Sequence, residues 1–227
     1  MPDRFRISAV MLTPVIFTAH ATLDGLLGAL LFDGLQDVDE AHAAIPLLAT
    51  DGLFHASSAR LLGVSSARKL GFIAGLRASH DIDLSLIQRN AGGEPHKALG
   101  LTRRSDFGNV ANAYLAHAAE VVEWTAEGDG DRTIELLQGV HAIGKRRNAG
   151  FGEVLSWHIE SAEDNGVVGA GGHVLRPVPV EVLGNGRSEI MADAAWCPAY
   201  WNPRNRAPCY IPSGRIEFTV RQETASA

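Results

Sequence analysis

The chain has 227 residues, 46% of them hydrophobic and 20% charged, which predicts one large or two small domains with an ample core. Its formal net charge of −6 excludes a strongly basic surface but leaves room for a local basic site on an acidic body. The absence of a run of about eighteen apolar residues argues against a membrane span, and the presence of only two cysteines excludes a disulfide scaffold and favours reduced thiols in the cytoplasm.

The N-terminal part predicts a strand, a helix and further strands. Residues 4–12 alternate apolar and polar side chains, which is the period of a half-buried strand. Thr22 is placed to cap a helix whose leucines share one face, and Gly34 follows as a stop signal. Two further strands are predicted at residues 53–62 and 71–77.

The middle of the chain predicts a hairpin and two helices. The turn NAGGEP between LSLIQR and HKALGLTRR indicates a hairpin over residues 84–103, which ends at Arg103 and Arg104. The spacing of apolar residues predicts a helix at residues 108–119 and another at about 131–143.

The last third changes to the period of strands. EVLSWHIE, residues 153–160, alternates cleanly; residues 174–183 contain prolines that restrict them to a sheet edge, and residues 215–221 alternate again. These elements predict an α+β fold whose antiparallel sheet carries two helices on one face. We expect a core at residues 1–165 with the hairpin inserted, and a β-rich extension at 166–227 packed on the same core.

A glycine-rich cationic loop, AIGKRRNAGFGEV, separates the second helix from the strand that follows it. It is not a phosphate-binding P-loop, because Arg146 stands where that motif needs Ser or Thr and because no strand precedes it. Its glycines permit sharp bends, successive amides in such a bend can form a concavity for anions, and three cations in series match spaced phosphates. The alternative is a glycine-rich turn with solvated charges. The candidate RNA-binding residues are Gly144, Lys145, Arg146, Arg147, Asn148, Gly150, Phe151 and Gly152, with Arg103 and Arg104 of the hairpin.

These residues resemble the glycine-rich loop of the RAMP superfamily of CRISPR-associated RNA-binding proteins. The pattern in that family is glycine, hydrophobic, glycine, five residues including a basic one, then glycine, hydrophobic, glycine. Here Ala142, Ile143 and Gly144 precede KRRNA, and Gly150, Phe151 and Gly152 follow it, with Ala142 in place of the first glycine. The match covers about a tenth of the chain, and the opening strand with LDGLLGALL is similar to the first βα unit of the family.

The resemblance implies a fold and a function. The fold would be ferredoxin-like (RRM-like) with a protruding hairpin, for which residues 84–103 are the candidate. Length and the LDGLLGALLF segment look most like the small subunit that caps the 5′ handle of the guide RNA in type IV effector complexes. The implied partners are the guide RNA, a backbone subunit and a large subunit, with no cofactor, no metal and no catalysis.

Two other functions compete with this one. A metal-independent ribonuclease that processes guide RNA needs a general base and a cation, which His20 or His141 and Lys145 could supply. No spacing forces these residues together, so a lone histidine at a surface or core position is the competing interpretation. The third function is a protein–protein adaptor whose basic loop binds an acidic partner.

The segment CPAYWNPRNRAPC near the C-terminus allows two weaker hypotheses. Zinc would need close ligand pairs, and Cys197 and Cys209 do not form one, with or without His173. The aromatic residues Trp196, Tyr200 and Trp201, with Arg204 and Arg206, could stack on unpaired bases, or the aromatic residues could pack against the sheet.

Overall fold

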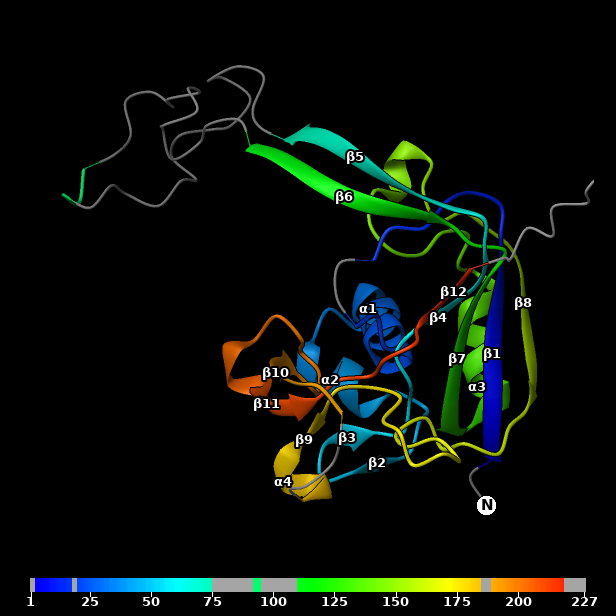
Figure 1. Ribbon diagram of the computed structural model, residues 1–227. Coiled ribbons are helices and arrows are strands. Elements are labelled where there is room, and N and C mark those ends of the chain that lie inside the picture. The colour runs from blue at the N-terminus through cyan, green and yellow to red at the C-terminus, as the bar shows by residue number, and fades with distance from the viewer. Residues whose placement is uncertain (1–2, 18–19, 75–91, 95–109, 185–188, 219–227) are drawn as a thin grey trace, which may run out of the picture. The chain divides into compact units, whose positions relative to one another are not determined.

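The computed structural model describes residues 3–17, 20–74, 92–94, 110–184 and 189–218 (Figure 1). The chain divides into two compact units, one formed by residues 1–67 and 116–227 and the other by Arg68–Leu115.

The first unit combines helices with several small sheets and one larger sheet. Its helices are α1 (Leu23–Leu35), α2 (Val38–Ala43), α3 (Gly130–Gln138) and α4 (Val180–Leu183). The strands of the larger sheet are β1 (Asp3–Met11), β4 (Arg60–Val64), β7 (Val121–Gly128), β8 (Val154–Ser161) and β12 (Ile216–Phe218). The smaller sheets contain β2 (Ala49–Thr50), β3 (Leu53–Phe54), β9 (Val178–Pro179), β10 (Met191–Ala195) and β11 (Arg206–Tyr210).

The five-stranded sheet has the spatial order β12-β4-β7-β1-β8. Neighbouring strands are antiparallel, except that β12 runs parallel to β4. Strand β1 lies between β7 and β8, and its Ile7 lies opposite Trp124 of β7 and Ile159 of β8. Helix α1 lies in the connection from β1 to β4, and α3 connects β7 to β8. The expected α+β class with a mostly antiparallel sheet is therefore confirmed.

Alternation along β1 separates a core face from a polar face. Phe5, Ile7 and Ala9 are buried in one cluster with Leu27 of α1 and Leu137 of α3. Successive side chains of a strand point to opposite faces, so the polar residues between them lie on the face away from these helices. The two helices thus cover one face of the sheet, as the sequence predicts.

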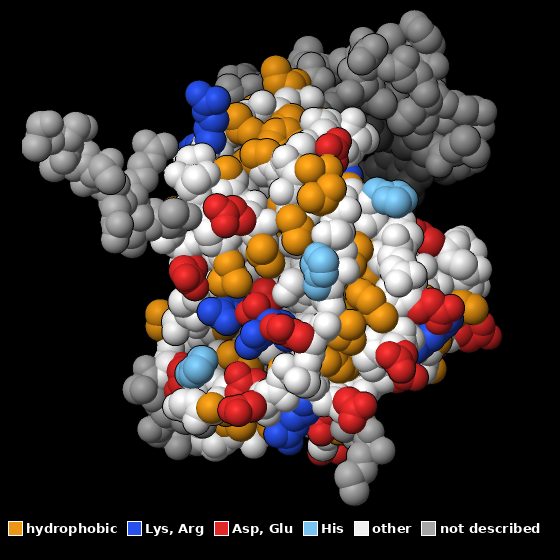
Figure 2. Space-filling model, turned by 90° about the vertical axis from the view of Figure 1, so that its right-hand side faces the viewer, with side chains coloured by type: hydrophobic (Ala, Val, Ile, Leu, Met, Phe, Trp, Pro, Cys, Tyr) orange, Lys and Arg blue, Asp and Glu red, His pale blue; other side chains and the backbone are white. Residues whose placement is uncertain are grey.

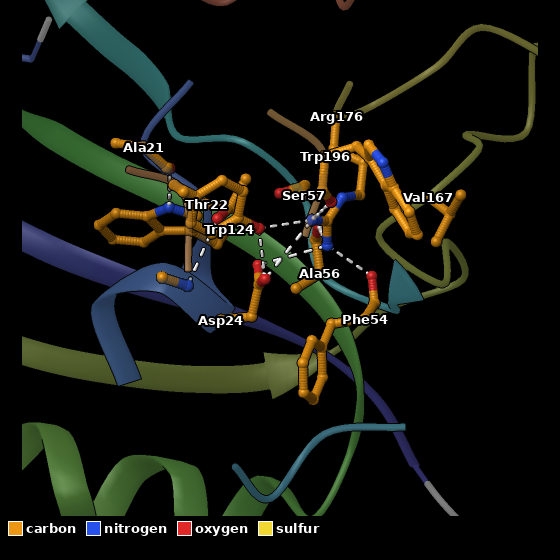
Figure 3. A network of polar contacts seen from close by, with 12 residues as sticks. Ala21, Thr22, Asp24, Phe54, Ala56, Ser57, Trp124, Val167, Arg176 and Trp196 are labelled. Carbon is orange, nitrogen blue, oxygen red and sulfur yellow. Dashed lines mark hydrogen bonds and ion pairs between the residues drawn. The ribbon is translucent and has the colours of Figure 1, made fainter. Parts of the chain in front are cut away.

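A buried ion pair joins the C-terminal part of the chain to the first helix (Figure 3). The fully buried Arg176 guanidinium lies 3.3 Å from the Asp24 carboxylate of α1 and donates to the Ala56 carbonyl (3.1 Å). It also donates to the Trp196 carbonyl (2.7 Å), while the Tyr200 hydroxyl donates to Asp24. Burial opposes the charge of Arg176, but the nearby carboxylate and tyrosine outweigh it and raise its pKa. The network holds Arg176, Trp196 and Tyr200 against the core, whereas the predicted domain boundary at residue 165 stays a prediction.

The second unit contains most of β5 (Ser66–Ala74) and β6 (Val110–Ala118), which pair in a two-stranded sheet. The rings of Phe72 and Tyr114 lie 5.8 Å apart between centroids. Apart from residues 92–94, the predicted hairpin at 84–103 lies outside the described residues.

Two predicted elements are wrong. The predicted helix at 108–119 is instead strand β6 over its described residues, because pairing with β5 decides its conformation. The predicted edge strand at 174–183 contains only the two residues of β9 before the chain turns into α4. No helix among the described residues is long and apolar enough to cross a membrane.

Candidate nucleic-acid interface

The glycine-rich loop lies between α3 and β8 and is closed at its base by backbone hydrogen bonds. The Ile143 amide donates to the Gly152 carbonyl (2.8 Å), and the Val154 amide donates to the His141 carbonyl (2.9 Å). Ala142 and Glu153 form an isolated bridge between the two arms. The loop therefore leaves and returns to the core at one defined point.

The loop is also attached to the segment that follows β1. The Lys145 amide donates to the Ile16 carbonyl (2.9 Å), and the Gly152 amide donates to the Pro14 carbonyl (2.9 Å). Ile16 is fully buried. These bonds hold the loop base on residues that the core already fixes.

The three glycines have the positive φ angles that the sequence analysis expects. Gly144, Gly150 and Gly152 have φ of +81°, +82° and +74°. A Cβ atom on Gly152 would lie 1.9 Å from the Ile143 carbonyl oxygen, and one on Gly144 would lie 2.6 Å from the Ile16 carbonyl oxygen. A Cβ on Gly150 would meet nothing within 4 Å. Gly144 and Gly152 are thus required by close backbone contact, and Gly150 by its conformation alone.

The tip of the loop is a short 3-10 turn, Arg147–Ala149, which Arg146 enters with a φ of +63°. The amides of Ala149 and Gly150 donate to carbonyls within the turn, at 2.9 and 3.0 Å. Together with the amides of Lys145 and Gly152, these groups are occupied. The prediction that successive amides of the bend face an anion is therefore wrong for these four positions.

The side chains of the tip are accessible. Lys145, Arg147 and Asn148 are exposed, and Arg146 and Phe151 are half-buried. On the face of the molecule seen in Figure 2, basic side chains lie mostly beside acidic ones rather than in one large basic area. Mixed charge of this kind favours a local contact with a polyanion over a broad one.

The residues predicted for ribonuclease catalysis differ in their surroundings. No hydrogen bond or ion pair within the described residues joins the side chains of His20, His141 and Lys145 to one another. Burial, and to a smaller extent the charge of Arg215, lowers the pKa of His20 to about 4. His20 is therefore neutral at pH 7, and its buried Nδ1 has no hydrogen-bond partner among the described residues. His141 is exposed.

The other residues that the sequence singled out lie in different surroundings. Arg103 and Arg104 lie outside the described residues. Cys197 and Cys209 are free thiols. Of the three aromatic residues, Trp196 packs against a small buried cluster that includes Val174, Tyr200 packs beside Gly25 of α1, and Trp201 is 77% exposed.

Two arginines that the sequence analysis does not single out have unusual positions. Arg176 is fully buried in the network of Figure 3, and its signal in the sequence is a lone cation within the apolar run VLRPVPV. Arg215 is half-buried just before β12, and no local pattern marks it.

Comparison of the chain with models of known protein families finds no match. Comparison with curated proteins likewise finds no significant match.

Proposed function

We propose that this chain is a non-catalytic RNA-binding subunit of a CRISPR effector ribonucleoprotein, with a ferredoxin-like core of the RAMP type. The observation that carries the proposal is the position of the glycine-rich cationic loop. It lies between the last helix and the last strand of a β1-α1-β4-β7-α3-β8 unit, which is where the resemblance requires it.

The strand order supports the ferredoxin-like assignment. Two β-α-β halves whose strands interleave give a four-stranded antiparallel sheet with both crossover helices on one face. Strands β4-β7-β1-β8 have this order, and α1 and α3 pack on one face. In the sheet, β12 extends the edge beside β4. In the sequence, β5 and β6 lie between β4 and β7.

The chemistry of the loop supports RNA as the ligand. Hydrogen bonds close the base of the loop and fix it to Pro14 and Ile16, and Lys145 and Arg147 lie at the exposed tip of the loop. A rigid base reduces the entropy lost when the tip binds, and exposed cations attract phosphates without reading sequence. By resemblance, the RNA is the 5′ handle of a guide, and the neighbours are the backbone and large subunits of a cytoplasmic type IV complex.

The proposal is tested by RNA affinity over a salt series. The probe is a single-stranded RNA that carries the repeat handle encoded beside the gene. Each lost phosphate contact should flatten the slope of log affinity against log salt by roughly 0.7. We expect this change for Arg147→Ala and up to about three times as much for the Lys145, Arg146 and Arg147 triple alanine variant.

A matched control is Arg132→Ala on α3, an exposed arginine paired with Glu135 in the adjacent turn of the same helix. It should leave the slope unchanged. Wild-type affinity and slope in the triple variant would show that the loop is a glycine turn with solvated charges. Site-specific cleavage of the repeat RNA in EDTA, lost in His20→Ala or His141→Ala, would instead support the ribonuclease.

A further inference from the structure

A polar cavity opens on the face of the sheet away from α1 and α3. Its volume is about 450 Å³. Strand β1 contributes Arg6, which alternates with the core residues Phe5 and Ile7, and β4 contributes Arg60. The wall also includes Ser58, Glu123, Asp164 and Arg215.

The carboxylates of this cavity are already engaged by other groups. Glu123 lies 3.3 Å from the Arg6 guanidinium and 3.0 Å from that of Arg60, so one buried carboxylate is shared by two cations. Asp164 accepts a hydrogen bond from the Ala170 amide (2.8 Å). Neither acid therefore neutralises the third arginine of the wall.

That third arginine, Arg215, has a desolvated charge without a counter-ion. Within the described residues its guanidinium makes no hydrogen bond and no ion pair, although the side chain is half-buried. Burial lowers its pKa, with no opposing contribution from a carboxylate. A cation that is taken out of water without a partner costs free energy, and a bound anion would remove that cost.

A second group of the same wall also has no partner. Ser58 is 1% exposed, and no described atom forms a hydrogen bond with its buried hydroxyl oxygen. Buried hydroxyls nearly always have a partner, and the described residues supply none here, so a bound ligand could fill that role. Ser58 and Arg215 come from separate segments of the chain and line one cavity.

We propose that this cavity binds a phosphate group. Three guanidinium groups and a hydroxyl that approach from β1, β4 and the residues before β12 suit the several oxygens of a tetrahedral anion better than the two coplanar oxygens of a carboxylate. The volume accommodates a phosphate together with part of an attached nucleoside. That the cavity holds a phosphate follows from its own residues, whereas RNA as the source of that phosphate rests on the proposed function.

The test compares Arg215→Gln with wild type in the presence of inorganic phosphate. Thermal stability is followed as phosphate rises, with sodium chloride at equal ionic strength as the reference. Wild type should be stabilised by phosphate beyond the chloride reference. Arg215→Gln should bind phosphate at least about tenfold more weakly, because a charged hydrogen bond is lost. Ser58→Ala should weaken binding severalfold, and Arg132→Gln should bind like wild type.

A purely structural role for Arg215 predicts a different result. In that case Arg215→Gln would melt lower than wild type without phosphate, whereas removal of an unpaired desolvated charge should leave the melting temperature unchanged or higher. Equal stabilisation of wild type by phosphate and chloride, or wild-type phosphate affinity in Arg215→Gln, would overturn the proposal.

Two further probes identify the source of the phosphate. If the handle RNA binds Arg215→Gln with a salt slope flattened by roughly 0.7, the cavity holds a phosphate of the RNA backbone. An unchanged RNA slope, combined with loss of binding to phosphate and adenosine monophosphate, assigns the cavity to a small phosphate compound. A protein that binds phosphate but no RNA would refute the proposed function and leave the phosphate site standing.

Discussion

Alanine substitutions at Gly150 and Gly152 should distinguish the energetic cost of a steric clash from the cost of a positive φ angle in the candidate RNA-binding loop. Gly150 and Gly152 have similar positive φ angles, +82° and +74°. A Cβ on Gly150 would enter open space, whereas one on Gly152 would lie 1.9 Å from the Ile143 carbonyl oxygen. Gly150→Ala therefore measures the conformational cost alone, and Gly152→Ala adds a clash to it.

The expected magnitudes follow from these contacts. A left-handed backbone costs an L residue about 1–2 kcal/mol. In Gly152→Ala the two arms must also move apart, which loses the bond from the Ile143 amide and the bond to Pro14, at about 1 kcal/mol each. Gly150→Ala should therefore lower the free energy of unfolding by about 1–2 kcal/mol and Gly152→Ala by about 3–4 kcal/mol. For a chain of this size these losses correspond to melting temperatures lower by about 3–6 °C and about 10 °C.

Urea denaturation followed by circular dichroism, together with calorimetry, would measure both losses. Gly150→Ala should also retain RNA binding, because the loop base is intact. Equal destabilisation by the two substitutions, or a melting temperature of Gly152→Ala within about 2 °C of wild type, would refute the close contact between the two arms.

Two further predictions concern buried groups. Arg176→Met should lower the free energy of unfolding by about 3–5 kcal/mol, because Asp24 is left buried without a cation. Adding Asp24→Asn should recover at least about 1 kcal/mol, and strictly additive losses in urea denaturation would contradict this. For His20, the pKa is about 4 in the folded protein and about 6.5 when unfolded, so the unfolded state binds the proton more tightly and stability falls as pH falls from about 6.5 towards 4. Allowing for solvent screening of this partly exposed ring, we expect a loss of about 1–2 kcal/mol that disappears in His20→Gln and persists in the exposed-site control His158→Gln.

Elements with local signals could be predicted from the sequence. Helix α1 begins after Thr22, whose hydroxyl accepts a hydrogen bond from the Gly25 amide, and its leucines face the core as their spacing predicts. Strand β1 follows the alternation of its residues, and β8 is a strand where the alternation predicts one, although its Leu155 is 63% exposed. In each case the information lies within a few residues of the element itself.

The helix predicted at 108–119 shows where local signals fail. Ala111, Tyr114 and Leu115 have helical spacing, yet they belong to strand β6. The pairing partner of β6 is β5, which lies some 40 residues earlier in the chain. Pairing over such a distance can override a local preference for helix, and one sequence does not reveal the partner.

The loop and the cavity also differ in how far the sequence could predict them. The loop could be located from its glycines and cations, but the occupation of its amides by Pro14 and Ile16 depends on a segment more than a hundred residues away. The cavity around Arg215 could not be located at all, because β1, β4 and the residues before β12 meet only in the folded sheet. Long-range packing decides which cations are solvated and which are desolvated.

This difference in solvation gives the two candidate phosphate contacts different roles. The exposed cations of the loop act through water, so salt screens their attraction strongly, and such charges mainly raise the rate of association. Arg215 is half-buried in a cavity, where screening is weaker and where loss of a partner leaves an uncompensated charge. An RNA that engaged both sites would be captured by the loop and held in register by the cavity.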